Sequence, residues 1–275
     1  MKIPFIILFI GKTLQSISKT LAAKYAKYLF QKPIKYPLPK REVNMDNSSV
    51  QYELEVTKIG KKINVYEYGK GDKKVLLVHG WSGRGTQLFK IADAFLEKGY
   101  QVISFDAPAH GKSPSKTSLM PEFIASIHQL DKKYGGFEMA IGHSLGAMSV
   151  LNALKEGLQL QKAVIISSGN SVEDIAHHFS KQLELKPKVA KKMIALFENQ
   201  YKMKMEPYSA YVAVENIEIP LLIIHDENDF EVPFSCSVAI NKAAKNSTLI
   251  ATKGLGHRKI VGDAAVVQNC IDFID

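Results

Sequence analysis

Short runs rich in Val, Ile and Leu alternate along this 275-residue chain with longer segments of helical periodicity. Such runs are typical of strands that are buried on both faces of a parallel sheet. Eight strands are expected, at residues 53–57, 63–68, 75–79, 102–105, 137–141, 163–168, 221–225 and 248–252. Because strands that alternate with helices form βαβ units, the sequence predicts an α/β protein with a doubly wound, mostly parallel eight-stranded sheet that starts with a hairpin.

One insertion interrupts this alternation. About 50 residues separate the runs at 163–168 and 221–225, which is far more than a crossover connection needs. The insertion contains helical patterns at 175–183 and 189–201. We therefore expect one domain over residues 42–275, with a helical cap inserted at about residues 169–218.

Residues 142–146 (GHSLG) match the pattern G-x-S-x-G. The match follows the run at 137–141 and begins a helical segment at 145–155, which is the strand–turn–helix setting of a nucleophile elbow. The glycines there allow a sharp turn that leaves the serine hydroxyl exposed. The sequence therefore predicts Ser144 as a candidate nucleophile.

A serine hydroxyl needs a base that takes its proton and a group that orients the base. His257 lies after the last predicted strand, and Asp229 lies after the strand before it. Asp226 is the rival acid, but Asp229 stands in a D-x-x-V-P register and is preferred. The predicted order is thus Ser144, Asp229, His257.

Five motifs in this order carry a family resemblance. They are residues 79–81 (HGW), 106–113 (DAPAHGKS), 142–146 (GHSLG), 229–233 (DFEVP) and 256–257 (GH). Over roughly residues 52–275 the chain resembles the serine hydrolases of the α/β-hydrolase superfamily, which are esterase- or lipase-like enzymes with a helical cap. Ala109 departs from the family pattern, which commonly has Gly at that position.

The resemblance implies a role for each site residue. Ser144 would be the nucleophile, His257 the general base and then acid, and Asp229 the residue that orients the imidazole. The backbone N–H groups of Trp81 and Leu145 would form the oxyanion hole. Asp106 and the histidines at 79, 110 and 143 are expected to have structural roles.

The expected reaction is hydrolysis of a small-molecule carboxylic ester through an acyl-enzyme on Ser144. An acyltransferase, a peptidase or amidase, and a ligand receptor with little turnover remain as alternatives. No metal or other cofactor is expected, because the sequence contains no H-E-x-x-H or nucleotide-binding glycine motif, and Cys236 and Cys270 are too few for a thiolate zinc site.

Aromatic and sulfur-containing side chains gather in the expected cap. Two interpretations are open: they cover an apolar acyl pocket above Ser144, or they pack the cap onto the domain. The residues are Phe179, Met193, Phe197, Tyr201, Met203, Met205, Tyr208 and Tyr211.

The net charge of +9 is confined to the N-terminal segment. Residues 1–41 carry nine Lys or Arg and no Asp or Glu, so the remainder has 27 basic and 27 acidic side chains. A neutral body does not favour nucleic-acid binding.

Residues 1–41 are an apolar and lysine-rich segment with helical spacing. Three interpretations are open: a signal peptide, an amphipathic helix on an anionic membrane surface, and a helix that packs against the body or a second subunit. We expect a cytoplasmic protein that can contact the inner membrane surface peripherally; the sequence does not indicate an oligomeric state.

Overall fold

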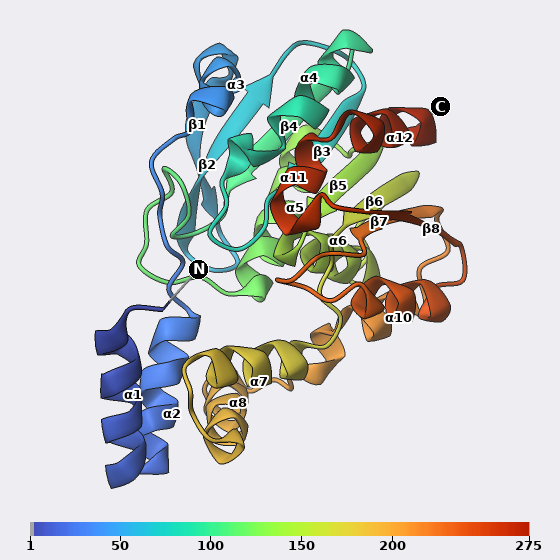
Figure 1. Cartoon of the computed structure of the whole chain (residues 1–275). Helices are drawn as coiled ribbons and strands as arrows, with labels where there is room; N and C mark the ends of the chain where they lie inside the picture. The colour runs from blue at the N-terminus through green and yellow to red at the C-terminus, as the bar shows by residue number, and fades with distance from the viewer. Residues whose placement is uncertain (1–2, 275) are drawn as a thin grey trace.

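A computed structural model describes residues 3–274 (Figure 1). Lys2, one of the basic residues counted above, and Asp275, the end of the expected domain, lie outside the described residues.

The strands are β1 (Val50–Val56), β2 (Lys61–Tyr68), β3 (Lys74–Val78), β4 (Gln101–Asp106), β5 (Met139–His143), β6 (Lys162–Ile166), β7 (Leu221–Asp226) and β8 (Ser247–Thr252). The longer helices are α1 (Phe5–Ile17), α2 (Lys19–Phe30), α4 (Phe89–Glu97), α5 (Met120–Tyr134), α6 (Leu145–Lys155), α7 (Val172–Gln182), α8 (Pro187–Tyr201), α10 (Ser235–Ala243) and α12 (Ala264–Ile274). Shorter helical segments are η1 (Lys40–Glu42), α3 (Val43–Ser48), η2 (Gly85–Leu88), η3 (Glu206–Tyr208), α9 (Ala210–Val214), α11 (Gly256–Lys259) and η4 (Ile260–Gly262).

The strands form one eight-stranded sheet in the order β1-β2-β4-β3-β5-β6-β7-β8. β1 pairs antiparallel with β2, and β2 pairs antiparallel with β4. Every other neighbouring pair is parallel. The predicted doubly wound, mostly parallel sheet with a leading hairpin is therefore confirmed.

Successive side chains of β3 enter two different cores, because side chains alternate between the faces of a strand. Leu76 and Val78 pack with residues of α5, α6 and α9 on one face of the sheet. Val75 and Leu77 pack with residues of α4 and α12 on the other face. Burial on both faces explains why the strand sequences are continuously apolar instead of alternating.

The segment between β6 and β7 consists of α7, α8, η3 and α9, and it lies beside α1 and α2 (Figure 1). α1, α2, α7 and α8 form a helical module with a core of its own. On α2, the side chains of Ala22, Ala23 and Ala26 are fully buried in this core. Their small size lets α2 approach α8 closely, so in the structure the N-terminal segment is packed against the inserted helices.

Within residues 3–274, no helix is both long enough and apolar enough to cross a membrane. Cys236 and Cys270 are both free thiols. Burial raises the pKa of Cys270 to about 12, so this thiol is protonated at neutral pH.

Candidate active site

Ser144 occupies the sharp turn between β5 and α6. Its backbone has φ 55° and ψ −119°, a conformation that a residue with a side chain rarely adopts. The flanking glycines have no room for a side chain. A Cβ on Gly146 would lie 2.3 Å from the carbonyl oxygen of Val78, and one on Gly142 would lie 2.6 Å from the backbone nitrogen of Ala147. The G-x-S-x-G pattern is thus required by the close approach of β3 and α6 to the turn.

The predicted oxyanion donors lie beside this serine. Leu145 is the first residue of α6, so its N–H has no partner within the helix. The loop that contains Trp81 touches the turn, since a Cβ on Gly80 would lie 3.0 Å from the Cβ of Ser144. Among the described residues, neither the Trp81 nor the Leu145 N–H donates a hydrogen bond, and both are free to bind an oxyanion.

Asp229 and His257 are brought together by the loops that follow β7 and β8. The Nδ1 of His257 lies 2.7 Å from the Oδ2 of Asp229. A carboxylate only accepts hydrogen bonds, so Nδ1 carries the proton and Nε2 is left with a free lone pair. The backbone N–H groups of Glu231 and Val232 donate to the Oδ1 of Asp229, each at 2.9 Å. The carboxylate is therefore fixed on both oxygens.

The rival carboxylate, Asp226, does not contact His257. It accepts hydrogen bonds from the N–H groups of Asn228 and Leu255 and from the hydroxyl of Thr252. These bonds hold the loop after β8 in place, so Asp226 positions the segment that carries the histidine.

A second imidazole, which sequence reasoning did not single out, touches Asp229. The Nε2 of His225 lies 3.0 Å from the Val232 carbonyl oxygen and 3.3 Å from the Oδ2 of Asp229. Since both of these groups only accept, Nε2 carries the proton, and Nδ1 accepts from the hydroxyl of Ser237 at 2.6 Å. His225 is fully buried at the end of β7. A histidine that ends an otherwise apolar run at the carboxyl edge of the sheet is the signal that could have found it.

Burial alone would raise the pKa of Asp229. Hydrogen bonds from His225, His257 and the Val232 N–H outweigh that effect, and the pKa lies below its usual value. Asp229 is consequently ionised at neutral pH.

The imidazole of His257 lies next to the turn that carries the serine. Its ring centroid is 4.8 Å from that of His143, the residue before Ser144. The Nε2 of His143 is 2.9 Å from the carbonyl oxygen of His257 and donates to it. The Ser144 hydroxyl itself makes no hydrogen bond with another described residue. Catalytic hydrogen bonds are commonly long or poorly aligned without substrate.

Asp106 and His79 have structural contacts around the same loops. Asp106 is buried and accepts hydrogen bonds from the N–H groups of Gly85 and Lys112 and from the hydroxyl of Tyr66. Its pKa is raised by burial. The Nε2 of His79 accepts from the N–H of Ala107 at 3.0 Å. Together they join the loop after β3 to the loop after β4.

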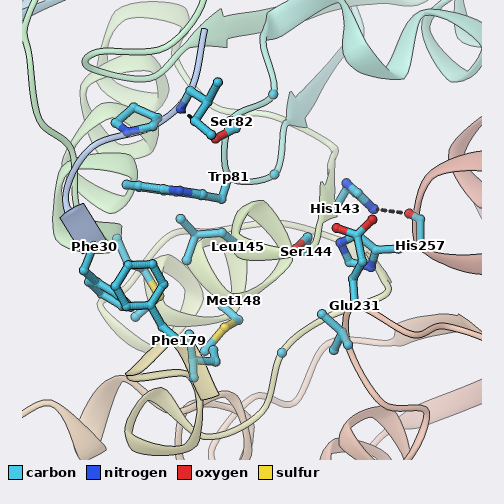
Figure 2. Close-up of a pocket in the computed structure, with 18 of the residues that line it drawn as sticks. Phe30, Trp81, Ser82, His143, Ser144, Leu145, Met148, Phe179, Glu231 and His257 are labelled. Carbon is cyan, nitrogen blue, oxygen red and sulfur yellow. Dashed lines mark hydrogen bonds between the residues drawn. The ribbon is translucent and has the colours of Figure 1, made fainter. Parts of the chain in front are cut away.

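An open cavity of about 2240 Å³ extends from Ser144 and His257 into the helical module (Figure 2). Trp81 and Leu145 lie close to Ser144 in this view, whereas Phe30 and Phe179 lie on the side of the cavity away from His257. The rings of Phe30 and Phe179 meet edge to face with centroids 5.2 Å apart. Apolar side chains therefore line the part of the cavity that extends into the helical module.

The cap residues of the sequence analysis divide into two groups. Met193 is buried in the core of the helical module, and the Tyr211 hydroxyl donates to Glu206, so neither lines the cavity. The other six line it: Phe179, Phe197, Tyr201, Met203, Met205 and Tyr208.

Among residues 3–274, no group of three His, Cys, Asp or Glu side chains is arranged to hold a metal ion.

The fold and the site together define an α/β protein with a serine on a strand–helix turn beside a hydrogen-bonded imidazole–carboxylate pair. A family model described as the alpha/beta hydrolase fold matches residues 73–202. Among solved structures, an esterase from Pyrococcus furiosus has a TM-score of 0.66 at 19% identity, and the match covers 89% of this chain and 97% of that one. The chain is also similar to the esterase EaEST from Exiguobacterium antarcticum, with a TM-score of 0.65 at 16% identity, over 82% of this chain and 99% of that one. A bromoperoxidase from Bacillus anthracis has a TM-score of 0.63 at 19% identity, over 82% of this chain and 99% of that one. The chain therefore has the α/β-hydrolase fold, and the family model matches slightly less than half of it.

One curated relative is similar in sequence over part of its length. It is the 2-hydroxy-6-oxononadienedioate/2-hydroxy-6-oxononatrienedioate hydrolase of Escherichia coli strain K12, 31% identical over 137 residues. The match covers 42% of this chain and 44% of the relative, so the chain spans less than half of the relative's length.

Proposed function

We propose that this protein is a serine hydrolase that cleaves carboxylic esters through an acyl-enzyme on Ser144. The observation that carries the proposal is the 2.7 Å hydrogen bond between His257 and Asp229, placed beside a serine held at φ 55°. A serine in this conformation presents its hydroxyl at the edge of the sheet, and the oriented imidazole supplies the base that the hydroxyl needs.

The reaction follows from these positions. The Nε2 of His257 takes the hydroxyl proton as the Oγ of Ser144 attacks the ester carbonyl carbon. The Leu145 and Trp81 N–H groups donate to the oxyanion that forms, and the ester C–O bond then breaks. His257 returns the proton to the leaving alcohol. A water molecule, deprotonated by His257, attacks the acyl-enzyme and releases the carboxylic acid.

Ionised Asp229 has two effects on this sequence. It keeps the proton of His257 on Nδ1, so that Nε2 is free to accept the serine proton. It also stabilises the imidazolium that forms during acylation and again during hydrolysis of the acyl-enzyme. Because its pKa lies below the usual value, it performs both roles throughout the neutral range.

The cavity favours an ester with an apolar acyl chain. Phe30, Met148 and Phe179 line it beyond the serine. The carboxylate of Glu231 also lines it and is neutralised by a bidentate ion pair with Arg258, at 2.8 Å and 3.2 Å. An apolar chain therefore meets apolar side chains in the part of the cavity beyond the serine.

Cleavage of a carbon–carbon bond is the second candidate, and its support is the sequence similarity to the Escherichia coli hydrolase. The substrate named for that relative is a dioate and thus carries two carboxylates. The apolar side chains that line this cavity beyond the serine, Phe30, Met148 and Phe179, suit an apolar acyl chain better than a dianion, so ester cleavage is the better-supported reaction.

A panel of p-nitrophenyl esters from acetate to laurate tests the proposal. We expect kcat/KM to rise with acyl length, since each buried CH₂ contributes about 0.8 kcal/mol, or roughly fourfold. Phe179→Ala should flatten this increase and leave acetate hydrolysis unchanged. Val238→Ala, at an exposed position on α10, is the matched control.

Other outcomes of the panel are equally informative. No turnover of any ester by folded protein contradicts ester hydrolysis and favours a ligand receptor. Turnover that requires an added alcohol or amine indicates an acyltransferase, and hydrolysis of only the corresponding anilides indicates an amidase. A preference for acetate alone contradicts the acyl pocket.

A further inference from the structure

The face of α1 that points away from the molecule is apolar. Phe5, Ile6, Phe9, Ile10 and Ile17 are 79%, 59%, 54%, 38% and 70% exposed. At 100° per residue these five positions fall on one side of the helix. Large apolar side chains that are exposed together on one face mark a surface that contacts a partner.

The opposite face of α1 already has its packing partners. A Cβ on Gly11 would lie 3.3 Å from the Cδ2 of Leu185, and the Tyr25 hydroxyl of α2 donates to the carbonyl oxygen of Ile7. Leu14 packs against the core of the helical module. The packing of α1 on α2 and the cap therefore buries the inward face of the helix and leaves its outward apolar side chains uncovered.

The charge around this face has one sign. Lys19, Leu21 and Lys24 of α2 are exposed. Residues 1–41 contain nine basic and no acidic side chains, whereas residues 42–275 are balanced. Lys12 of α1 pairs with Glu184 of the cap, and the structure gives Lys19 and Lys24 no ion pair with a described residue. The apolar face thus belongs to a segment with an excess of positive charge, part of which is not paired with a described carboxylate.

We propose that the outward face of α1 docks on an anionic lipid bilayer, with Lys19 and Lys24 contacting the headgroups. An apolar stripe along a 13-residue helix, about 20 Å long, in a segment rich in lysine, is typical of a helix that lies in the membrane interface. Each lysine near an anionic surface contributes about fivefold in affinity. A second copy of this chain would bring its own lysines to the contact, and like charges would face each other.

The position of α1 connects this surface with the cavity. Ile3, Pro4 and Ile7, at the start of α1, line the cavity that leads to Ser144. Docking would therefore place the cavity beside the bilayer, where an acyl ester can enter from the lipid. This consequence for the substrate rests on the proposed function, whereas the docking itself does not.

Vesicle flotation of the full chain carrying Ser144→Ala tests the docking separately from catalysis. We expect flotation with vesicles of phosphatidylcholine and 30% phosphatidylglycerol, and at least tenfold weaker binding to phosphatidylcholine alone or in 0.5 M salt. Phe5→Ser/Phe9→Ser should reduce binding at least tenfold, because two large apolar side chains no longer leave water. Lys19→Gln/Lys24→Gln should reduce binding to the anionic vesicles more than tenfold.

Matched controls use exposed residues elsewhere on the chain. Val50→Ser/Val238→Ser removes exposed apolar side chains from β1 and α10, and Lys116→Gln/Lys132→Gln removes two exposed lysines. Both should bind as the parent does. Circular dichroism of each variant in the Ser144→Ala background verifies folding. Hydrolysis of a soluble short-chain ester by the same substitutions in the active chain separates the two proposals.

Three results would overturn the docking. The first is that the folded parent does not float with the vesicles, and the second is that Phe5→Ser/Phe9→Ser floats as well as the parent. The third is that the parent forms a stable dimer in solution and does not bind vesicles, and that Phe5→Ser/Phe9→Ser dissociates this dimer. The last result would assign the face to a second copy of this chain.

Discussion

Asp229 is the most heavily constrained side chain of the candidate site. His257 and His225 contact its Oδ2, and two backbone N–H groups donate to its Oδ1. His225 is in turn held by Ser237. A carboxylate fixed in this way cannot rotate, so the direction of its hydrogen bond to His257 is set before substrate arrives.

His225 should therefore act as a positioning residue. A hydrogen bond to a charged group contributes about 1.5–3 kcal/mol, so His225→Ala should lower kcat about 10- to 100-fold with little change in KM. Its loss should also raise the pKa of Asp229, because one of the bonds that lower it is removed. The acid limb of the pH–kcat profile should then move to higher pH.

The controls for this prediction are His225→Gln and His177→Ala. His225→Gln keeps an N–H donor and should recover part of kcat, whereas His177→Ala, in the cap outside the cavity lining, should behave as the wild type. An unchanged acid limb in folded His225→Ala would show that this imidazole only fills space.

The turn between β5 and α6 depends on contact between elements as much as on its own residues. Gly146→Ala would place a Cβ 2.3 Å from the carbonyl oxygen of Val78 in β3. Relief requires α6 to move away from the sheet, which should cost about 1–3 kcal/mol or more in unfolding free energy and displace the Leu145 N–H. We expect loss of ester turnover by at least 10²-fold, the effect of losing one oxyanion donor.

Gly262→Ala is the control for this substitution, since its nearest contact would be an ordinary 3.7 Å from Lys90. Urea unfolding and ester kinetics on both variants give the comparison. Normal activity in Gly146→Ala would mean that the turn tolerates movement of α6.

Helices and strands were predicted correctly where the local sequence pattern determines the secondary structure. Continuously apolar runs predicted the six strands after the hairpin, and alternating sequences predicted the two strands of the hairpin. The helix after Ser144 begins and ends at the predicted residues 145 and 155. β1 begins at Val50, three residues before the predicted start, because residues 50–52 also pair with β2. The contact of His225 with Asp229 joins the end of β7 to the loop that follows it. The apolar run predicted the strand, but the direction of the buried imidazole also depends on the hydroxyl of Ser237 in α10, which the run does not encode. The packing of α2 on α8 likewise depends on alanines that have no special spacing signal.

Three buried histidines make the stability of the whole molecule depend on pH. Burial lowers the pKa of His110 to about 4 and that of His143 to about 3, and it lowers the pKa of His79 well below the usual value. The unfolded chain takes up protons at these positions near pH 6.5, whereas the folded chain does not. Stability from these groups is therefore complete above pH 6.5 and is lost as pH falls toward their folded pKa values.

Urea unfolding should show this loss between pH 7.5 and pH 5.5, at roughly 1 kcal/mol for each histidine. The raised pKa of Asp106 acts in the opposite direction, but only at more acidic pH, where carboxylates begin to be protonated. His110→Asn should reduce the slope of unfolding free energy against pH by about one proton, and His178→Gln, at an exposed position, should leave it unchanged. Identical slopes in wild type and His110→Asn would refute the burial argument.

Covalent labelling with a fluorophosphonate, followed by peptide mass spectrometry, tests the central proposal most directly. The oxygen of a serine that an adjacent base activates attacks the phosphorus of the reagent and displaces fluoride, so we expect the label on Ser144, none on Ser144→Ala, and at least 10³-fold slower labelling of Asp229→Asn. Ser144→Ala should also lower ester turnover by about 10⁶. Wild-type protein that is folded but unlabelled, or labelled at another serine, would contradict the assignment of Ser144 as the nucleophile.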